Sequence, residues 1–240
     1  IRITPRGKEE IDLEWGGKLV FINSVVGGAP EQWQRRELGV SQYVALLQAL
    51  GFAAAQAQTL ADTLTDWIDS DAQRAPLGAE DSTYAALQPG YRTSGTLLAE
   101  PSELRAIRGY DGASYARLRP YVCALPRAEL SPVNVNALDI DQAPVLSMLS
   151  LGRLTPAEAR RVIAARPDGG WPDATAFWAQ PALRDAELPR EVYDQVQLRS
   201  RWFTLQTEVD YAGAQAVLSA LLYADGDRAR LIVRRWTPDE

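Results

Sequence analysis

The part of this sequence best suited to chemistry is a cluster of six acidic residues. They lie within 20 positions: Asp62, Asp66, Asp69, Asp71, Glu80 and Asp81. Carboxylates in one loop repel one another unless water or a cation lies between them. Calcium binds about six to eight oxygen atoms, often from flexible loops. The cluster therefore favours a calcium site, with a solvated acidic loop as the alternative.

Two more specific interpretations of the cluster fail. With Asp69 at position 1 of an EF-hand loop, Glu80 falls at position 12, but Arg74 takes the glycine position and Pro76 lies inside the loop. This pattern excludes an EF-hand. Paired carboxylates also serve glycosidases, yet no nucleophile elbow, P-loop or dinucleotide motif accompanies them here. We therefore expect no enzymatic activity.

Two residue types that serve many active sites are scarce. Histidine is absent from the chain, and Cys123 is its only cysteine. This excludes Ser-His-Asp and Cys-His catalysis, zinc sites built from histidine or several cysteines, and an intramolecular disulfide. Because Cys123 lies in an apolar segment, we expect a small buried hydrophobic residue there rather than a reactive thiol.

The composition is that of an ordinary globular protein. Of the 240 residues, 46% are hydrophobic and 23% are charged, and 25 Lys and Arg face 31 Asp and Glu for a net charge of -6. This balance disfavours polyanionic partners. Apolar stretches such as residues 216–224 are shorter than the roughly 20 residues of a membrane span. The chain opens at Ile1 without an initiator methionine or signal region, as we expect of a truncated or processed product.

Strands are predicted at the two ends of the chain. Residues 19–26 are apolar and β-branched and are followed by Gly27-Gly28, which is typical of a strand and a turn. Period-two alternation and an Asp225-Gly226 turn predict a C-terminal antiparallel meander. Its three strands are expected over residues 202–209, 216–223 and 229–236. The arrangement predicts an α+β fold, in which a helical domain is inserted into an antiparallel β framework.

Helical periodicity dominates the middle of the chain. Apolar residues recur at helical spacing over residues 40–50, where Gly51 ends the helix, and again over residues 60–68. A short helix is expected over residues 102–107. The stretch between, residues 69–101, has little periodicity, and a compact domain tolerates such a stretch mainly when something such as a bound ion holds it.

An internal similarity links two distant parts of the sequence. Phe21-Ile22-Asn23 and Val133-Asn134-Val135-Asn136 are both extended segments that end in asparagine and precede a pair of short helices. Residues 46–51 and 146–152 are also alike. The similarity indicates an internal repeat.

The segment 133–183 resembles a helix-hairpin-helix, or SAM-like, repeat. Its second helix opens with the capping-box pair Thr155 and Glu158. DNA-binding members of this class hold a phosphate with a double-glycine turn, whereas this turn has Leu151 beside Gly152. Together with the net charge of -6, the turn favours the shape without the nucleic acid. A helix-hairpin-helix nucleic-acid-binding protein remains the alternative function.

Taken in chain order, several motifs make the sequence resemble the K-type minor pseudopilins of the type II secretion system. The motifs are Gly17-Lys18-Leu19-Val20-Phe21-Ile22-Asn23, Asp66-Trp67-Ile68-Asp69-Ser70-Asp71, Gly78-Ala79-Glu80-Asp81-Ser82-Thr83-Tyr84, Glu103-Leu104 with Gly109, Leu125-Pro126 and Val133-Asn134-Val135-Asn136-Ala137. The second and third are the most specific. The sequence departs from the family in having Ala137-Leu138 where the family usually has Thr-Ala, and it does not contain the family's N-terminal apolar helix.

The resemblance implies a fold and a place in the cell. It implies a pilin-like β framework over residues 1–27 and 200–240, and an inserted helical domain over residues 28–199. The family's place is the periplasmic tip of the pseudopilus, with attachment to the bacterial inner membrane only through the N-terminal helix. Its partners are the I-type and J-type minor pseudopilins, with which it initiates and caps the pseudopilus and touches secreted substrate.

The resemblance also implies a cofactor. Family members are similar in binding calcium through acidic residues, which assigns Ca²⁺ to the acidic cluster with Asp69, Asp71, Glu80 and Asp81 as its ligands. The resemblance implies no enzymatic activity and no nucleic acid.

Overall fold

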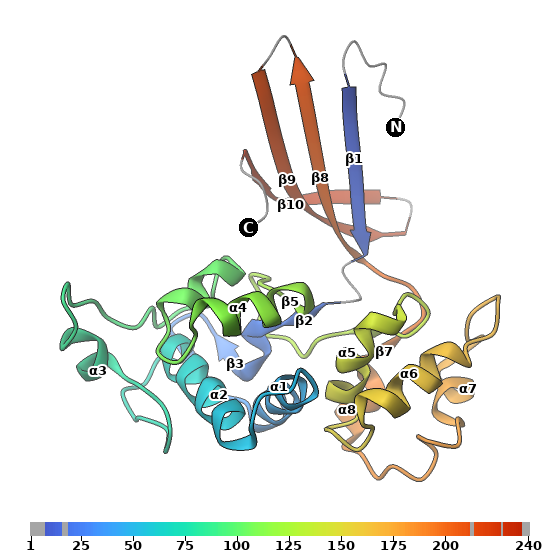
Figure 1. Cartoon of the computed structure of the whole chain (residues 1–240), viewed down its shortest axis with the longest axis horizontal. Coiled ribbons are helices and arrows are strands. Elements are labelled where there is room, and N and C mark those ends of the chain that lie inside the picture. Colours follow the sequence, from blue (N-terminus) through green and yellow to red (C-terminus); the bar gives the residue numbers. More distant parts are fainter. Residues whose placement is uncertain (1–7, 16–18, 212–213, 227, 237–240) are drawn as a thin grey trace.

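The protein folds as a small β-sheet joined to a larger helical part, as shown by a computed structural model that describes residues 8–15, 19–211, 214–226 and 228–236 (Figure 1). The sheet is antiparallel with the strand order β1-β8-β9-β10. Its strands are β1 (Lys8–Trp15), β8 (Trp202–Tyr211), β9 (Ala214–Asp225) and β10 (Arg228–Arg235). The mixed α+β architecture predicted from the sequence is confirmed.

Strands from the two ends of the chain close the sheet. The first strand, β1, pairs with β8 from Lys8 opposite Asp210 to Trp15 opposite Phe203. Strands β8, β9 and β10 form the predicted meander, and Gly226 adopts a φ of 59° in the turn between the last two. This positive φ suits glycine. The whole helical part is thus an insertion between β1 and β8.

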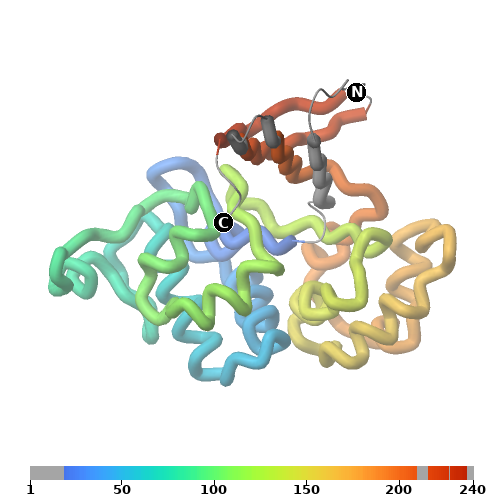
Figure 2. Tube along the Cα trace, turned by 45° about the horizontal axis from the view of Figure 1, so that its top comes forward, coloured from blue at the N-terminus to red at the C-terminus, as the bar shows by residue number. Residues whose placement is uncertain are grey.

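The helical part consists of two units that lie side by side (Figures 1 and 2). The first contains β2 (Val20–Phe21), β3 (Val26–Ala29), β4 (Gln32–Arg35), α1 (Glu37–Ala49), α2 (Ala54–Ile68), α3 (Asp81–Ala85), a 3-10 helix at Pro101–Ala106, α4 (Gly112–Leu118) and β5 (Val122–Cys123). The second contains β6 (Val133–Asn134), α5 (Ala143–Leu149), α6 (Pro156–Ala164), α7 (Ala174–Trp178), α8 (Arg190–Gln195) and β7 (Val196–Gln197). Figure 2 shows the C-terminal strands on one side of both units.

Helix α1 ends, and helix α6 begins, where the sequence predicts. Helix α1 stops at Ala49, and Gly51 follows with a φ of 86°, the left-handed conformation of a helix C′ residue. At the start of α6, the Glu158 amide donates to Thr155 Oγ1 (3.3 Å), and the Thr155 amide donates to Glu158 Oε2 (2.9 Å). The Thr155 hydroxyl also donates to Glu158 Oε2 (2.8 Å), and the bonds from the Thr155 amide and hydroxyl lower the pKa of Glu158. The capping box is confirmed.

Helix α1 lies at the centre of the core. It packs against both α2 and α5, so it touches both helical units. Leu46 and Leu47 of α1 are fully buried, as are Leu60 and Leu64 of α2. The side-chain Nε2 of Gln42 on α1 also donates to Gln195 Oε1 on α8 (2.7 Å) in the buried interior. The two units therefore share one hydrophobic core.

The prediction of one continuous strand over residues 19–26 is wrong. Only Val20–Phe21 pair with β5, in parallel; residues 22–25 form a 3-10 turn, and β3 then pairs with β4. Val20, Ile22 and Val26 are almost fully buried in the core of the helical part. A segment buried on all sides needs apolar residues without period-two alternation, and this one has them. The β framework was predicted to run to residue 27, but its N-terminal strand ends at Trp15.

The internal similarity seen in the sequence extends to the structure. The side-chain amide of Asn23 donates to the Leu98 carbonyl (2.9 Å), and its Oδ1 accepts from the Leu98 amide (2.9 Å). Asn136 makes the same pair of bonds with the carbonyl (3.0 Å) and amide (2.7 Å) of Trp171. Each unit also pairs its first and last strands in parallel. The repeat is thus two strand-flanked helical units, each clasped by one asparagine.

A second, smaller core joins the sheet to the helical part. Phe21, Leu125 and Trp202 are buried together, with Cys123 half-buried against them. At its edge, Arg235 Nη1 lies 2.9 Å from Glu100 Oε1, and Nη2 donates to the Ala99 carbonyl (3.0 Å). These contacts fix the sheet on the first helical unit.

The turn between α5 and α6 has a left-handed backbone at Leu151 (φ 54°) and Gly152 (φ 75°). Leu151 is half-buried. Helices α5 and α6 pack against each other across this turn, and the helix-hairpin-helix, or SAM-like, repeat stays a prediction. Within the described residues, the helices are all too short or too polar to cross a membrane.

Candidate metal centre

Three of the acidic residues come together at the end of α2. Asp69 is the C-cap of α2, Asp71 lies in the loop that follows, and Glu80 is the N-cap of α3. One carboxylate oxygen from each lies within 4.8 Å of the other two. Asp69 and Glu80 are buried, with 5% and 7% exposure, whereas Asp71 is exposed. The group therefore has two buried carboxylates and one that faces solvent.

The two buried carboxylates are not fully hydrogen-bonded by the described residues. Asp69 Oδ1 and Glu80 Oε1 are buried oxygens without a hydrogen-bond partner among the described residues. Burial above all, together with the charges of Asp71 and Asp66, raises the pKa of Asp69 from 3.8 to about 8. Burial, followed by the charge of Asp66, raises the pKa of Glu80 from 4.5 to about 6. Such oxygens are costly unless a proton or a cation neutralises them.

The C-terminal end of α2 also favours a cation at this position. Helix α2 runs for 15 residues and ends at Asp69, where its unpaired carbonyls carry partial negative charge. A carboxylate is unfavourable at this end of a helix and a cation is favourable.

Asp62 and Asp66 have a different role. Asp62 accepts from Arg35 Nη1 (3.0 Å) and from the Leu77 amide (3.2 Å), and Asp66 accepts from the Ala75 amide (3.2 Å). Both side chains are buried on the last turns of α2. They fold residues 75–77 back onto the helix, so they position the loop. The positive charge of Arg35 is thereby paired with Asp62 and not with Asp69.

Glycine at position 78 is needed for this close packing. A Cβ atom there would overlap a carboxylate oxygen of Asp66. The absence of a side chain lets the loop pass over Asp66 immediately before Glu80. The Gly-Ala-Glu-Asp motif therefore combines a close backbone approach at Gly78 with the buried carboxylate of Glu80 two residues later.

Asp81 does not join the other three. Its Oδ1 accepts from both the amide (2.9 Å) and the hydroxyl (2.8 Å) of Thr93, and these bonds lower its pKa. Its side chain is 48% exposed. The structure therefore uses Asp81 to hold the returning loop at residue 93.

Hydrogen bonds with residues outside the acidic cluster also hold the loop in place. The Ser70 hydroxyl accepts from the Trp33 amide (2.9 Å), and the Ser70 amide donates to the Trp33 carbonyl (2.9 Å). Farther along, the Ser94 hydroxyl and the Gly95 amide both donate to the Trp67 carbonyl, at 3.0 and 3.1 Å. Ser70 and Trp67 belong to the motif of residues 66–71, but no motif marks Trp33, Ser94 or Gly95, because these residues meet the loop only in the folded chain.

The residues present fit a hard cation. The site offers oxygen ligands alone, carries excess negative charge, and includes two buried oxygens without a protein donor. Calcium accepts this ligand type and tolerates one exposed side from which water can complete its coordination. The alternative of a solvated acidic loop does not describe Asp69 and Glu80, which are buried.

Comparisons with known proteins assign the chain to a family. Two family models match the sequence, over residues 21–127 and 133–198, and both are described as type II secretion system (T2SS), protein K. The two matches correspond closely to the two helical units. The chain belongs to the type II secretion system protein K family.

Individual relatives agree with the family models. The chain is 38% identical over 202 residues to type II secretion system protein K of Klebsiella pneumoniae, covering 82% of this chain and 61% of that protein. It is 33% identical over 191 residues to the protein of the same name from Pectobacterium carotovorum, covering 80% of this chain and 58% of the relative. The chain thus spans about three fifths of the length of the curated relatives it matches.

A solved structure has the same fold. The chain matches one in the crystal structure of the GspK-GspI-GspJ complex from the enterotoxigenic Escherichia coli type 2 secretion system, with a TM-score of 0.80 and 27% identity. The match covers 98% of this chain and 81% of the other.

Replacing Asp69 or Asp71 should remove the response to calcium. We expect calcium to stabilise the wild-type chain by about 2.7 kcal/mol at 100 times its Kd, and Asp69→Asn or Asp71→Asn to lose most of this gain. The measurement is the melting temperature with and without calcium. Asp168→Asn, which removes an exposed carboxylate elsewhere, is the control. Equal calcium responses in the site variants and the wild type would place the metal elsewhere.

Without metal, the chain should become less stable as the pH rises from about 4 to about 8. The folded state retains protons on Asp69, whose pKa is about 8, and on Glu80, whose pKa is about 6, while the unfolded chain has already lost them. Urea unfolding in a chelator, at a series of pH values, measures this decline. Asp69→Asn should flatten it above pH 6. A wild-type free energy of unfolding that rises between pH 6 and 8 would contradict the assigned burial.

Proposed function

We propose that the chain is a minor pseudopilin at the tip of the type II secretion pseudopilus, where it assembles with the I-type and J-type minor pseudopilins. The observation that carries the proposal is the likeness, over 98% of this chain, to a subunit of a complex named for three such proteins. In this role the protein has no enzymatic activity and acts by its shape and contacts.

The shape suits a terminal subunit. The sheet is narrow, and the helical part extends beyond it on both sides (Figure 1). We assign the antiparallel sheet to a pilin-like framework that stacks with other subunits. The inserted helical units then form a cap that is too wide for a further subunit to add above it. In this position the cap also meets secreted substrate.

The proposed location follows from this role. The sheet and the helical units lie in the periplasm, and an N-terminal apolar helix of the kind the family resemblance implies attaches the protein to the bacterial inner membrane. Helices α5 and α6 act as a helix-hairpin-helix, or SAM-like, packing element. Leu151 at their turn is half-buried, so this element serves the core.

Calcium is the proposed cofactor, and its role is structural. Asp69, Asp71 and Glu80 would hold the ion, and Asp81 positions the loop through Thr93. When bound, calcium supplies the positive charge that the buried oxygens of Asp69 and Glu80 lack. These residues then fix the loop after α2 against β4 through Ser70. A fixed loop presents a constant surface of the cap to partners.

Complex formation tests the proposed function directly. Mixed in calcium with soluble I-type and J-type minor pseudopilins of the same secretion system, the chain should co-elute with both as a 1:1:1 complex. Size-exclusion chromatography with light scattering gives the mass and the stoichiometry. The two partners without this chain are the control. A folded chain that elutes alone from every mixture would contradict the proposal.

A further inference from the structure

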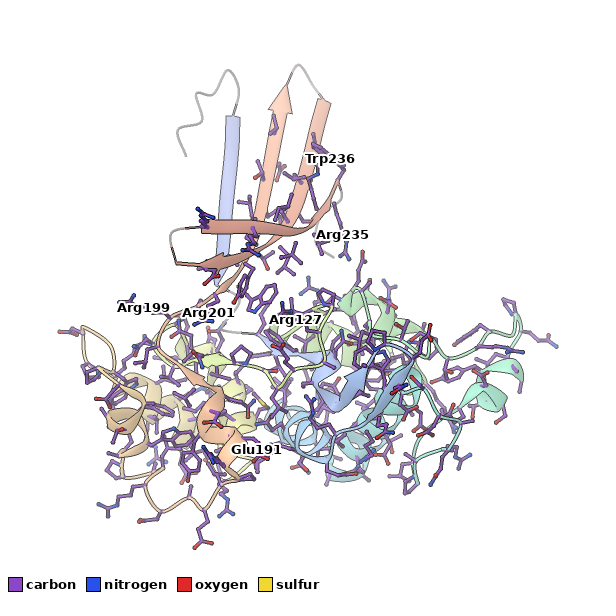
Figure 3. The ribbon with its side chains drawn as sticks, turned by 180° about the vertical axis from the view of Figure 1, so that it is seen from behind. Arg127, Glu191, Arg199, Arg201, Arg235 and Trp236 are labelled. Atoms are coloured by element: carbon purple, nitrogen blue, oxygen red, sulfur yellow. The ribbon has the colours of Figure 1, made fainter. Side chains whose placement is uncertain are left out.

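A basic cavity lies where the chain passes from the second helical unit into the sheet. It has a volume of about 270 Å³ and is lined by Arg127, Arg199 and Arg201 together with aromatic and neutral polar side chains. Figure 3 shows the three labelled arginines at one level, between the sheet and the helical part. Residues 198–201 form the connection from β7 to β8, so two of these arginines belong to the joint itself.

The charges of this cavity are largely unpaired. Arg127 Nη1 lies 3.2 Å from Glu129 Oε1, and Glu129 is the acidic residue that lines the cavity. Arg199 and Arg201 are exposed, and their guanidinium groups have no ion pair or hydrogen bond within the part of the chain that the structure describes. A chain with a net charge of -6 thus gathers three guanidinium groups around a single carboxylate.

The floor of the cavity is aromatic and rigid. The Arg127 guanidinium lies 5.4 Å from the ring centroid of Trp202 and 6.0 Å from that of Tyr223. The two rings are 4.8 Å apart, and Trp202 is buried in the small core that joins sheet and helices. Contact with the ring faces holds a guanidinium in place while its N–H groups stay available. Arg127 is therefore pre-oriented towards an anion.

Neutral polar groups complete the wall. Asn134 donates through Nδ2 to the Ser200 hydroxyl (2.9 Å), and both residues line the cavity. The amide oxygen of Asn134 accepts from the Asn136 amide (3.0 Å), which fixes the side chain. No acceptor for the Ser200 hydroxyl hydrogen lies among the described residues, so this hydroxyl can donate to a bound group.

We propose that this cavity, the arginine cavity of Arg127, Arg199 and Arg201, binds an acidic peptide segment of a partner protein. Guanidinium groups bind carboxylates through paired N–H donors, and the contact between Glu129 and Arg127 already places a carboxylate at the cavity wall. The volume of about 270 Å³ lies just below the roughly 300–1,000 Å³ of small-molecule sites. It suits one or two acidic side chains of an extended segment, while the aromatic floor accepts their apolar neighbours.

This inference goes beyond the proposed function, because it assigns a class of ligand to the arginine cavity. It holds whether or not the chain assembles with the I-type and J-type proteins. It favours a peptide over a membrane surface because the arginines converge on a cavity, whereas a lipid surface is met by a flat basic face. A membrane or a free phosphate remains a distinct outcome of the test.

A fluorescein-labelled, amidated Gly-Glu-Glu-Glu-Glu-Gly peptide is the probe, and the matching glutamine peptide is its control. Fluorescence polarisation at one fixed calcium concentration should show binding of the glutamate peptide alone, weakening as salt is added. The double variant R199Q/R201Q should weaken this binding by about tenfold. The variant R153Q/R160Q removes the same charge from exposed positions on and before α6 and should bind as the wild type does.

Glu129 provides a test in the opposite direction. Because it competes for Arg127, E129Q should strengthen binding of the glutamate peptide by about threefold. Equal binding of both peptides, or an equal loss in the two double variants, would overturn the proposal. So would binding of inorganic phosphate or phosphatidylglycerol vesicles without binding of the peptide. Melting temperatures of the same variants show whether each variant is folded. Co-elution of these variants with the I-type and J-type proteins tests the proposed function separately from peptide binding.

Discussion

The fully buried side chain of Asn23 makes three hydrogen bonds to the backbone of two distant segments. Its Nδ2 donates to the carbonyls of Leu98 (2.9 Å) and Leu125 (2.6 Å), and its Oδ1 accepts from the Leu98 amide (2.9 Å). Buried backbone groups need partners, and here one side chain serves three of them. Leu98 ends the irregular stretch that carries the acidic cluster, and Leu125 belongs to the small core beneath the sheet. Asn23 therefore connects the loop that carries the candidate metal site with the joint that carries the β-sheet.

The hydrogen bonds of Asn23 and Asn136 place the acidic site and the arginine cavity in two related units. The loop from Asp69 leaves α2, passes Glu80 and returns to Leu98, where Asn23 holds it, so a cation bound at the acidic site would fix a segment whose other end is already held. The second unit repeats the clasp with Asn136 and Trp171 but has no comparable acidic group among the described residues. It ends instead at the joint where Arg199 and Arg201 meet the sheet. The two related units thus carry opposite charges at separate sites, one suited to a cation and one to an anion.

Local patterns predicted much of this fold. Helical spacing located α1 and α2, an Asp-Gly turn located the β9–β10 hairpin, and the capping box located the start of α6. Features that depend on distant partners were missed. Strand β1 exists because it pairs with β8, whose residues lie 188 to 202 positions later in the chain, and the segment after it is core rather than sheet. At the site, composition indicated the acidic cluster, but the burial of Asp69 and the diversion of Asp81 to Thr93 arise only when the loop returns.

The most direct test of this account is the calcium affinity of Asn23→Ala, measured by isothermal titration calorimetry beside Asn136→Ala. Each variant leaves buried backbone groups without partners, at a cost of about 1–3 kcal/mol per group, so urea unfolding should show both to be destabilised. If the Asn23 clasp anchors the metal-binding loop, Asn23→Ala binds calcium more weakly than the wild type, whereas Asn136→Ala binds it with unchanged affinity. A folded Asn23→Ala chain with wild-type calcium affinity would contradict the claim that the clasp connects the loop with the rest of the protein.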